Sequence, residues 1–486
     1  MNLATRCGVQ NSARAAAVKA LLAQIQSLGL TQLRVVWCDL HGSLRSKTLV
    51  CGTDDLSALV EVLDNGLGMV STLLLKDSAD QTAVPVFEPG ALRGLPGVGA
   101  ANNMLLLPDP HSLKTLPWAP ATGWLRAQPF WADGSSVAVC PRTVLQCVLG
   151  DLADQGFVLR CGLEVEFHIH RISRSSLPAE PAALRSLHPG YQLLSDAYAD
   201  QAAEALAIVQ HTALGLGLPL TSLEIEMGPS QFEAVFAATD ALTAADNMVL
   251  FRNGVRQALR RAGYQASFAT LPPFAASVAS GWHLHHSLLN AAGDNAFLRD
   301  SPAPDSTPGD ACHTLSDAGA HWLAGLLQHA AGLTALCVPS VAGYGRLKGA
   351  LMAPQAPVWA LDNRSAMLRV LGGAGEPSTR IENRLGEPMA NPYLCLAGHV
   401  VAGLDGLRRG LQPGPATPAT TAGNAPRLPA TLGAALDALA DDGVLTQGLG
   451  AQMLHAYLSV KRHELARFAA ADDPAAWLAE EYFSRF

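Results

Sequence analysis

Charged residues are scarce in this chain of 486 residues: 15% are Asp, Glu, Lys or Arg, and aromatic residues make up 6%. Acids outnumber bases and leave a formal net charge of −8, whereas binding to nucleic acid phosphates needs a basic surface. No apolar run reaches the length that crosses a bilayer. We therefore expect neither nucleic acid nor membrane as a partner, and the 49% of apolar residues fits a well-packed globular protein of more than one structural unit.

The nine cysteines include no C-x-x-C pair and are odd in number, which argues against a zinc cluster or a disulfide scaffold. The chain also lacks a charged and then apolar export signal at its start. We expect reduced, mostly buried cysteines in a cytoplasmic protein. Residues 11–28 instead read as an amphipathic helix, with an apolar face of Val18, Leu21, Leu22, Ile25 and Leu28.

Strand and turn signals dominate the first part of the chain. Residues 33–39 and 45–50 read as strands around a His41-Gly42 turn, and residues 85–123 are rich in Pro and Gly. This pattern predicts a small, mainly β domain over residues 1–138.

The second part alternates strands with helical stretches, which predicts an α+β catalytic domain over residues 139–486. Pro141-Arg142-Thr143 opens its first helix. The helical stretches are 144–155, 196–217, 240–262, 316–336 and 432–468. Residues 291–314 and 412–429 read as surface loops.

The most informative segment is Arg380-Ile381-Glu382-Asn383-Arg384. On a strand, residues two apart share a face, so both arginines and the carboxylate would share one surface. Burying three charges is costly unless a ligand needs them. A metal ion together with anionic oxygens is such a ligand.

Three further segments alternate in the same way: Glu164-Val165-Glu166, Glu224-Ile225-Glu226 with Glu233 beyond it, and His283-Leu284-His285 with Ser287. Singly, each is more simply a solvated strand edge or a structural histidine. Together they predict a site for Mg²⁺ or Mn²⁺ and polyphosphate. Cationic groups for that site are Arg346, Arg364, Arg369, Arg380 and Arg384. The sequence has no Walker loop and no G-x-G-x-x-G turn after a strand.

In their order and spacing, these motifs resemble those of the glutamine synthetase family over almost the whole chain. Residues 34–47 (RVVWCDLHGSLRSK) resemble the first strands of its β-grasp N-terminal domain. The metal and nucleotide motifs correspond to residues 162–167, 226–233 and 281–288. Other matching segments are 117–118, 140–143, 343–347, 363–365, 380–382 and 391–394. The resemblance implies a small β-grasp domain followed by a catalytic domain built as a partial barrel of antiparallel strands with helices.

The resemblance also implies roles for individual residues. The metal that organises the acid substrate would be held by Glu166, Glu226 and Glu233. The metal that bridges the ATP phosphates would be held by Glu164, His283 and Glu382. Contacts to ATP and the transferred phosphoryl group would come from His285, Ser287, Arg364, Arg369 and Arg380. The substrate carboxylates would be bound by Arg346, Arg384 and Arg364, whose planar guanidiniums suit carboxylates.

The implied reaction is phosphorylation of a γ-carboxylate by ATP, followed by attack of an amine on the acyl phosphate. Asp39 matches a catalytic aspartate that a neighbouring subunit contributes to the ammonium site. The family forms rings, so the resemblance implies a homo-oligomer of two stacked hexamers with active sites between subunits. Residues 412–429 contain no Tyr, which predicts that regulation by tyrosine adenylylation is absent.

Two departures from the family pattern concern the amine. Met352 stands where a flap glutamate helps to deprotonate ammonium, and an expected Asp-Gly-Ser-Ser reads Met69-Val70-Ser71-Thr72. A shifted loop alignment or a neutral family variant would also explain Met352. A pocket with fewer acids favours a larger, less polar amine.

The leading hypothesis is therefore a γ-glutamyl–amine ligase of amine catabolism. The alternatives are a glutamine synthetase that uses ammonia and, less favoured, a non-catalytic structural homologue. Val278-Ala279 replaces an Asn-Gly that contacts the amino acid end of glutamate in the family. This segment therefore does not support glutamate as the acid substrate, and the expectation of glutamate rests on the other motifs.

Overall fold

The computed structural model describes residues 1–52, 55–173, 183–274, 276–349, 352–417 and 426–486. In these residues helices and strands are mixed along the chain, and the strands form two sheets. The fold is therefore α+β, as predicted. No helix of the described ranges combines the length and the hydropathy that a membrane crossing requires.

The N-terminal part is a six-stranded mixed sheet in the order β2-β1-β6-β4-β3, with β5 paired to β6. β1 and β6 run parallel. Apolar residues of α2 and α3 pack beside Leu33 and Leu125 of this sheet. Its elements are α1 (Leu3–Arg6), α2 (Ser12–Ser27), β1 (Gln32–Cys38), β2 (Leu44–Val50), α3 (Ser57–Asn65), β3 (Leu67–Val70), η1 (Ser71–Leu75), β4 (Asn103–Pro108), β5 (Lys114–Thr115) and β6 (Thr122–Phe130).

The remainder is built on a nine-stranded sheet in the order β13-β14-β15-β12-β7-β10-β9, with β8 and β11 also paired to β7. All pairs except β13 with β14 are antiparallel. The strands are β7 (Val158–Ser173), β8 (Ala183–Ser186), β9 (Leu220–Ile225), β10 (Gln231–Asp240), β11 (Tyr264–Ser267), β12 (Trp282–Leu289), β13 (Trp359–Leu361), β14 (Leu368–Leu371) and β15 (Arg380–Asn383).

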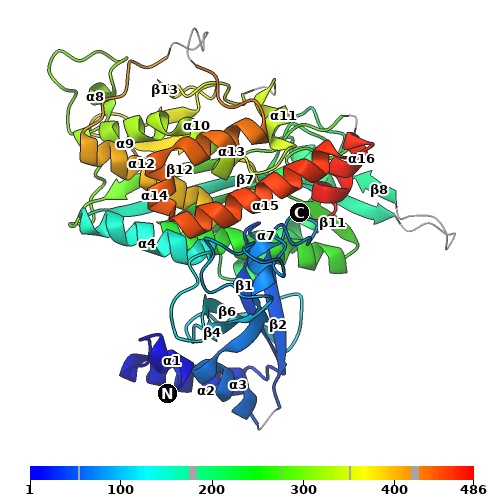
Figure 1. Cartoon of the computed structure of the whole chain (residues 1–486). Helices are drawn as coiled ribbons and strands as arrows, with labels where there is room; N and C mark the ends of the chain where they lie inside the picture. Colours follow the sequence, from blue (N-terminus) through cyan, green and yellow to red (C-terminus); the bar gives the residue numbers. More distant parts are fainter. Residues whose placement is uncertain (53–54, 174–182, 275, 350–351, 418–425) are drawn as a thin grey trace.

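Helices pack against this sheet and against one another, and α12 is buried along most of its length. Figure 1 shows the N-terminal part below the larger part, with β1 and β2 reaching toward α7. The helices are α4 (Pro141–Asp154), α5 (Asp196–Gln201), α6 (Ala203–Gly215), α7 (Ala241–Arg261), α8 (Ala311–Thr314), α9 (Asp317–Gln328), α10 (Ala330–Cys337), α11 (Gly343–Leu347), α12 (Pro392–Arg409), α13 (Leu432–Asp441), α14 (Gly443–Leu449), α15 (Ala451–Ala469), α16 (Pro474–Leu478) and the π-helical turn η2 (Ala479–Phe483).

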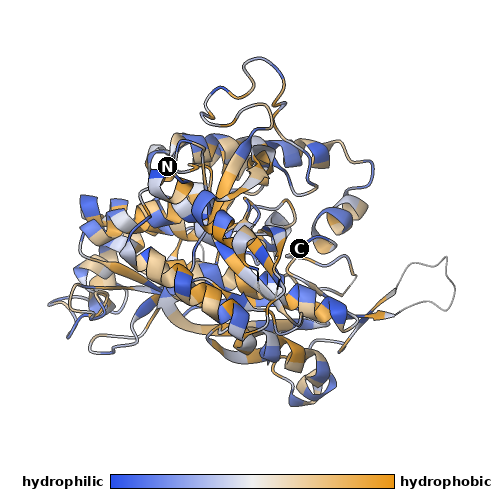
Figure 2. Ribbon diagram, turned by 90° about the horizontal axis from the view of Figure 1, so that it is seen from below, coloured by the Kyte–Doolittle hydropathy of each residue, from blue (hydrophilic) through white to orange (hydrophobic). Residues whose placement is uncertain are grey.

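Side-chain caps mark the start of several helices. The side chain of Asn11 caps α2 by accepting from the backbone N–H of Arg14 at 2.8 Å. Asp240 caps α7 in the same way through Thr243. Figure 2 shows blue and orange alternating along several helices, as expected for helices with one solvent-facing side.

Most predicted elements are present, with corrected bounds. The stretch 196–217 is two helices, and the stretch 316–336 breaks at His329 into α9 and α10. Leu28 was expected on the apolar face of the first helix, but it is the C-cap and is exposed. The predicted loop at 291–314 ends in the short helix α8, and the loop at 412–429 falls partly outside the described residues.

Candidate functional site

Strand register brings the predicted metal ligands together. Across β7 and β10, Glu166 lies opposite Glu233, and across β7 and β12, Glu164 lies opposite His283. Glu382 of β15 pairs directly with His285 of β12. The candidates therefore form a row across four adjacent strands.

The alternation of β7 separates this row from the core. Leu163, Val165 and Phe167 are buried on one face, and the intervening glutamates lie on the other. The same alternation holds at β15, where Asn383 points away and donates to Nε2 of His399 at 2.8 Å. The predicted sharing of faces is confirmed at both strands.

The first predicted metal group is assembled. Glu166, Glu226 and Glu233 each offer a carboxylate oxygen, and the three oxygens lie within 4.8 Å of one another. Glu226 comes just after β9, and its carboxylate accepts from the backbone N–H of Met227. The role of these residues as metal ligands remains a prediction.

The second predicted group is arranged differently from the expectation. His283 lies 3.3 Å from Glu164 and 3.9 Å from Glu382 through Nδ1. Two sets of donor atoms fall within 4.8 Å: Glu164 with Glu233 and His283, and Glu164 with His285 and Glu382. His283 therefore lies close to Glu233 of the first predicted group as well as to Glu164 of the second. His285, which was expected to contact ATP, is itself close enough to Glu164 and Glu382 to share a metal ion with them.

The electrostatics of the row fit a divalent cation. Burial, together with the neighbouring carboxylates of Glu166 and Glu164, raises the pKa of Glu233 to about 10. Oε1 of Glu233 is buried without a hydrogen-bond partner among the described residues. Burial lowers the pKa of His283 to about 4, so its ring is neutral and keeps a lone pair. Neutral imidazole beside clustered carboxylates is a donor set that Mg²⁺ or Mn²⁺ can use.

Three of the predicted arginines lie around Glu382, which is fully buried. Nη1 of Arg369, on β14, lies 2.9 Å from Oε2 of Glu382. Arg384 forms an ion pair with the other oxygen of Glu382. Arg380 donates through Nε to Nδ1 of His285 at 3.1 Å.

The other predicted residues are placed less uniformly. Arg346 is buried on α11 and donates to the backbone carbonyl oxygens of residues 384, 385 and 386. The side chain of Arg364 is exposed and makes no hydrogen bond or ion pair with the described part of the chain. Ser287 lines a cavity of about 240 Å³ together with Glu164, His285 and Arg380.

Asp39 lies in the turn between β1 and β2, and among the described residues its side chain contacts none of the glutamates of the row. Its carboxylate pairs with Arg45 at 2.7 Å and accepts from the backbone N–H groups of His41 and Ser43. Within one chain, these contacts among the described residues stabilise a turn. Its predicted catalytic role would therefore require a neighbouring subunit.

Sequence reasoning assigned no role to two buried residues that organise the site. Nε2 of Gln231 donates to Glu166 and to Oγ of Ser280, both at 3.0 Å. Glu387 accepts from Ser340 N at 2.7 Å and from the hydroxyl of Thr270. Gln231 lies inside the motif at residues 226–233, which could have indicated its role. Glu387 is a single Glu after a strand and belongs to no recognisable pattern.

The apolar residues that depart from the family pattern differ in their exposure. Met352 has a positive φ of 62° and is 43% exposed. Met69 is buried at the end of β3, and Val70 is exposed. No acid replaces the missing ones at these positions.

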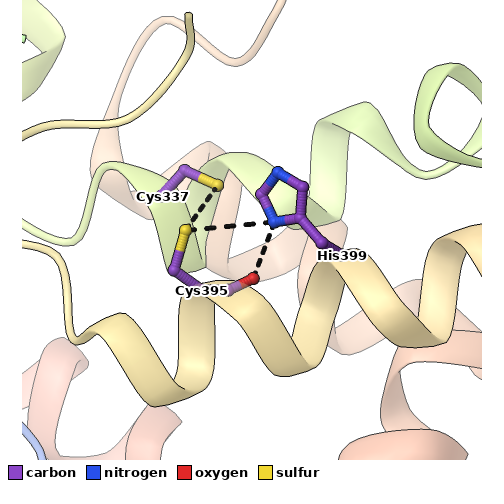
Figure 3. A group of neighbouring side chains, drawn as sticks. All are labelled: Cys337, Cys395 and His399. Carbon is purple, nitrogen blue, oxygen red and sulfur yellow. Dashed lines mark hydrogen bonds between the residues drawn. The ribbon is translucent and has the colours of Figure 1, made fainter. Parts of the chain in front are cut away.

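All nine cysteines are free, and six of them are buried, which agrees with the prediction. Figure 3 shows Cys337, Cys395 and His399 together, with the two sulfur atoms 3.5 Å apart. Nδ1 of His399 donates to the backbone oxygen of Cys395 at 2.7 Å, and Nε2 accepts from Asn383. Both ring nitrogens are thus engaged within the protein, which favours a structural histidine over a metal ligand.

Comparison with known proteins places this arrangement in a family. Residues 138–482 match the family model described as glutamine synthetase, catalytic domain. A γ-glutamylanilide synthase of Acinetobacter is 34% identical, covering 96% of this chain and 95% of the relative. A glutamine synthetase of Halobacterium salinarum is 27% identical, covering 96% of this chain and 97% of the relative. A solved structure of GmaS with ADP is 29% identical and has a TM-score of 0.75, covering 94% of this chain and 98% of the other. The chain belongs to the glutamine synthetase family.

Proposed function

We propose that the chain is an ATP-dependent carbon–nitrogen ligase that joins the γ-carboxylate of glutamate to an organic amine. The observation that carries this proposal is the cross-strand row of Glu164, Glu166, Glu233, His283 and Glu382 beside the arginines of β14 and β15. Such a row suits a reaction in which anionic oxygens must be neutralised and aligned.

The proposed reaction has two steps. An oxygen of the γ-carboxylate attacks the terminal phosphorus of ATP, which forms an acyl phosphate and releases ADP. The amine nitrogen then attacks the acyl carbon, phosphate leaves, and the nitrogen loses a proton to give a γ-glutamylamide. Divalent cations held by the carboxylate row would neutralise charge on the phosphates and the carboxylate.

The chain's own residues would orient both substrates. The cavity lined by Ser287, His285 and Arg380 is next to Glu164 and is our candidate for the nucleotide. Arg369 and Arg384 are held at the site by their ion pairs with Glu382. They would pair with a phosphate or a substrate carboxylate when these bind. Arg346 would act beside them, and Arg364 is free to swing inward because its side chain is exposed.

An organic amine is favoured over ammonia by the apolar residues at Met352, Met69 and Val70. Glutamine synthesis remains the second candidate because Asp39 is retained. A non-catalytic role is disfavoured because all six predicted ligands are present and five of them lie in cross-strand register.

A coupled ADP-release assay with glutamate tests the proposal. Ammonia, a short alkylamine, a polyamine and an aromatic amine serve as alternative nucleophiles, and mass spectrometry identifies the amide. We expect ADP release that depends on both glutamate and an organic amine. Turnover with ammonia alone would identify a glutamine synthetase, and failure to bind Mn²⁺ with nucleotide by calorimetry would favour the non-catalytic alternative.

We further propose a cytoplasmic homo-oligomer of two stacked hexamers, with each active site completed by Asp39 of a neighbouring subunit, and a domain boundary between residues 138 and 139. Among the described residues, the side chain of Asp39 contacts Arg45, His41 and Ser43 and none of the predicted metal ligands of its own chain, which supports a shared site. Mass photometry of the full chain measures the assembly, and a monomer with full activity would contradict it. A role in amine catabolism is proposed with the ligase activity.

A further inference from the structure

Two loops border the Glu226 end of the site, namely residues 187–195 and 270–281, and of the second loop residues 270–274 and 276–281 are described. The backbone N–H of Tyr191 donates to the carbonyl oxygen of Met227 at 2.7 Å, directly after Glu226. In the second loop, the N–H of Gly281 donates to Glu166 at 2.9 Å. Both loops are therefore tied by hydrogen bonds to segments that carry predicted metal ligands.

Neither loop contains an Asp, Glu, Lys or Arg residue; the sequences are LHPGYQLLS and TLPPFAASVASG. Their one histidine, His188, is buried, and burial lowers its pKa; the other ionisable side chain on the two loops is the phenol of Tyr191. A ligand that lies against these loops would find no side chain with a formal charge. Charged ends of a substrate are therefore poorly matched here.

Large apolar side chains on these loops are exposed instead. The exposed fractions are 60% for Tyr191, 47% for Leu193, 62% for Leu194, 46% for Leu271 and 39% for Phe274. We call these five residues the apolar rim. Large exposed apolar side chains on loops that are hydrogen-bonded to a site are a feature of ligand-binding surfaces.

The two aromatic rings of the apolar rim are held in place. The hydroxyl of Tyr191 donates to the carbonyl oxygen of Ala276 at 3.0 Å and so connects the two loops. The ring of Phe274 lies 4.8 Å from that of His170 and 5.4 Å from that of Phe483. A surface that is already ordered loses less entropy when a ligand binds to it.

We propose that the apolar rim binds the organic substituent of the amine, so that the preferred nucleophile is a monoamine with an apolar body. This inference rests on the proposed ligase function and narrows its substrate class. Glutamate does not suit the apolar rim because its carboxylates need cationic partners such as Arg384. A polyamine does not suit it because neither loop carries an acid that could pair with the second ammonium.

A matched pair of amines tests the inference: hexylamine and 1,6-diaminohexane, which differ by one terminal ammonium. With glutamate and Mg²⁺–ATP, we expect kcat/KM for hexylamine to exceed that for the diamine by about tenfold or more, because the unpaired charge opposes binding. Ammonia should also be a poorer nucleophile than hexylamine. Equal values for hexylamine and the diamine would overturn the inference.

A gain of function separates the apolar rim from effects on folding. Leu271→Glu supplies a carboxylate, so the ratio of kcat/KM for hexylamine to that for diaminohexane should fall by about threefold, with KM for ATP unchanged. The control is Leu214→Glu, which places the same acid at an apolar residue of α6 that is 54% exposed, and it should leave the ratio unchanged.

The outcomes distinguish the two proposals. No turnover with any amine, ammonia included, would overturn the ligase function and the inference together. Turnover with an unchanged ratio in Leu271→Glu would overturn the inference alone. If that variant also dissociates by mass photometry, the apolar rim is covered by a second copy of the chain, and the inference is again wrong.

Discussion

Nη1 of Arg369 lies 2.9 Å from Oε2 of Glu382, and the two residues face each other directly across β14 and β15. Arg384 pairs with the second oxygen of the same carboxylate. One fully buried glutamate thus neutralises two arginines that we expect to meet anionic substrates. Both guanidinium groups are therefore held next to the carboxylate row while each is paired with an acid, so neither is a buried unpaired charge.

Glu382→Gln removes this charge while keeping the size of the side chain. Because two guanidiniums lose their partner, we expect the free energy of unfolding to fall by about 3 kcal/mol and the affinity for Mn²⁺ to fall about tenfold or more. Urea unfolding and calorimetry measure the two effects. The control is Glu481→Gln, since Glu481 is also buried between two arginines, Arg467 and Arg485. It should lose stability but not Mn²⁺ affinity, and unchanged Mn²⁺ binding by Glu382→Gln would contradict the metal assignment.

Glu233→Gln should affect the protein with and without metal differently. Burial and neighbouring acids raise the pKa of Glu233 to about 10, so the side chain is protonated at neutral pH when no cation is bound. Gln imitates the protonated acid, and the Tm in EDTA should change by no more than about 2 °C. Mg²⁺ should raise the Tm of the wild type but much less that of the variant. A rise of equal size in both proteins would count against Glu233 as a ligand.

Glu387 should act as a positioning residue for the acid substrate. Its carboxylate accepts hydrogen bonds from Ser340 and from Thr270. Ser340 lies just before α11, which carries Arg346. The backbone oxygen of Thr270 accepts from the N–H of Ser280 at 2.7 Å. Glu387→Gln places an NH₂ group against these donors, so KM for glutamate should rise about tenfold while KM for ATP stays within about twofold. Steady-state kinetics measure both constants. A fall in kcat with both KM values unchanged would argue for another role.

Met352→Glu restores the acid that the family pattern has at this position. A carboxylate at an exposed loop residue should attract ammonium and help to take its proton. We expect kcat/KM for ammonia to rise about tenfold or more, with that for hexylamine unchanged or lower. Met352→Gln, which adds polarity without charge, is the control. If both variants behave alike, Met352 does not mark the position of the missing base.

His329 makes the stability of the chain depend on pH. Burial lowers its pKa, but Asp442 at 2.7 Å and Asp405 at 3.0 Å outweigh burial and raise the pKa above the ordinary value. The stabilising effect is therefore complete below the unfolded value of about 6.5 and is lost as pH rises through the folded pKa. Urea unfolding at several pH values should show that the difference between wild type and His329→Gln shrinks above about pH 6.5. A difference that does not change with pH would refute this assignment.

The sequence was sufficient for the fold class and for the residues that share a strand face. Period-two alternation places Glu164 and Glu166 together, and likewise Arg380, Glu382 and Arg384, because side-chain direction is a local property of a strand. The family motifs extended this to six candidate ligands; the structure brings five of them into one row and places Glu226 near Glu166 and Glu233.

Cross-strand partners could not be derived in the same way. The register of β12 with β7 and with β15 depends on the whole sheet, so the approach of His285 to Glu164 and the position of His283 between both groups were missed. Glu387 was missed because its partners, Thr270 and Ser340, are distant in sequence. The break at His329 was missed because the apolar pattern continues across it.

A competition experiment tests the central claim most directly. The full chain is incubated with glutamate, Mg²⁺–ATP, and equal concentrations of hexylamine and ¹⁵N-ammonium, and mass spectrometry follows both amides over time. We expect γ-glutamylhexylamide to form faster than labelled glutamine, with ADP released in equal amount to the total amide. Labelled glutamine as the main product would contradict the account.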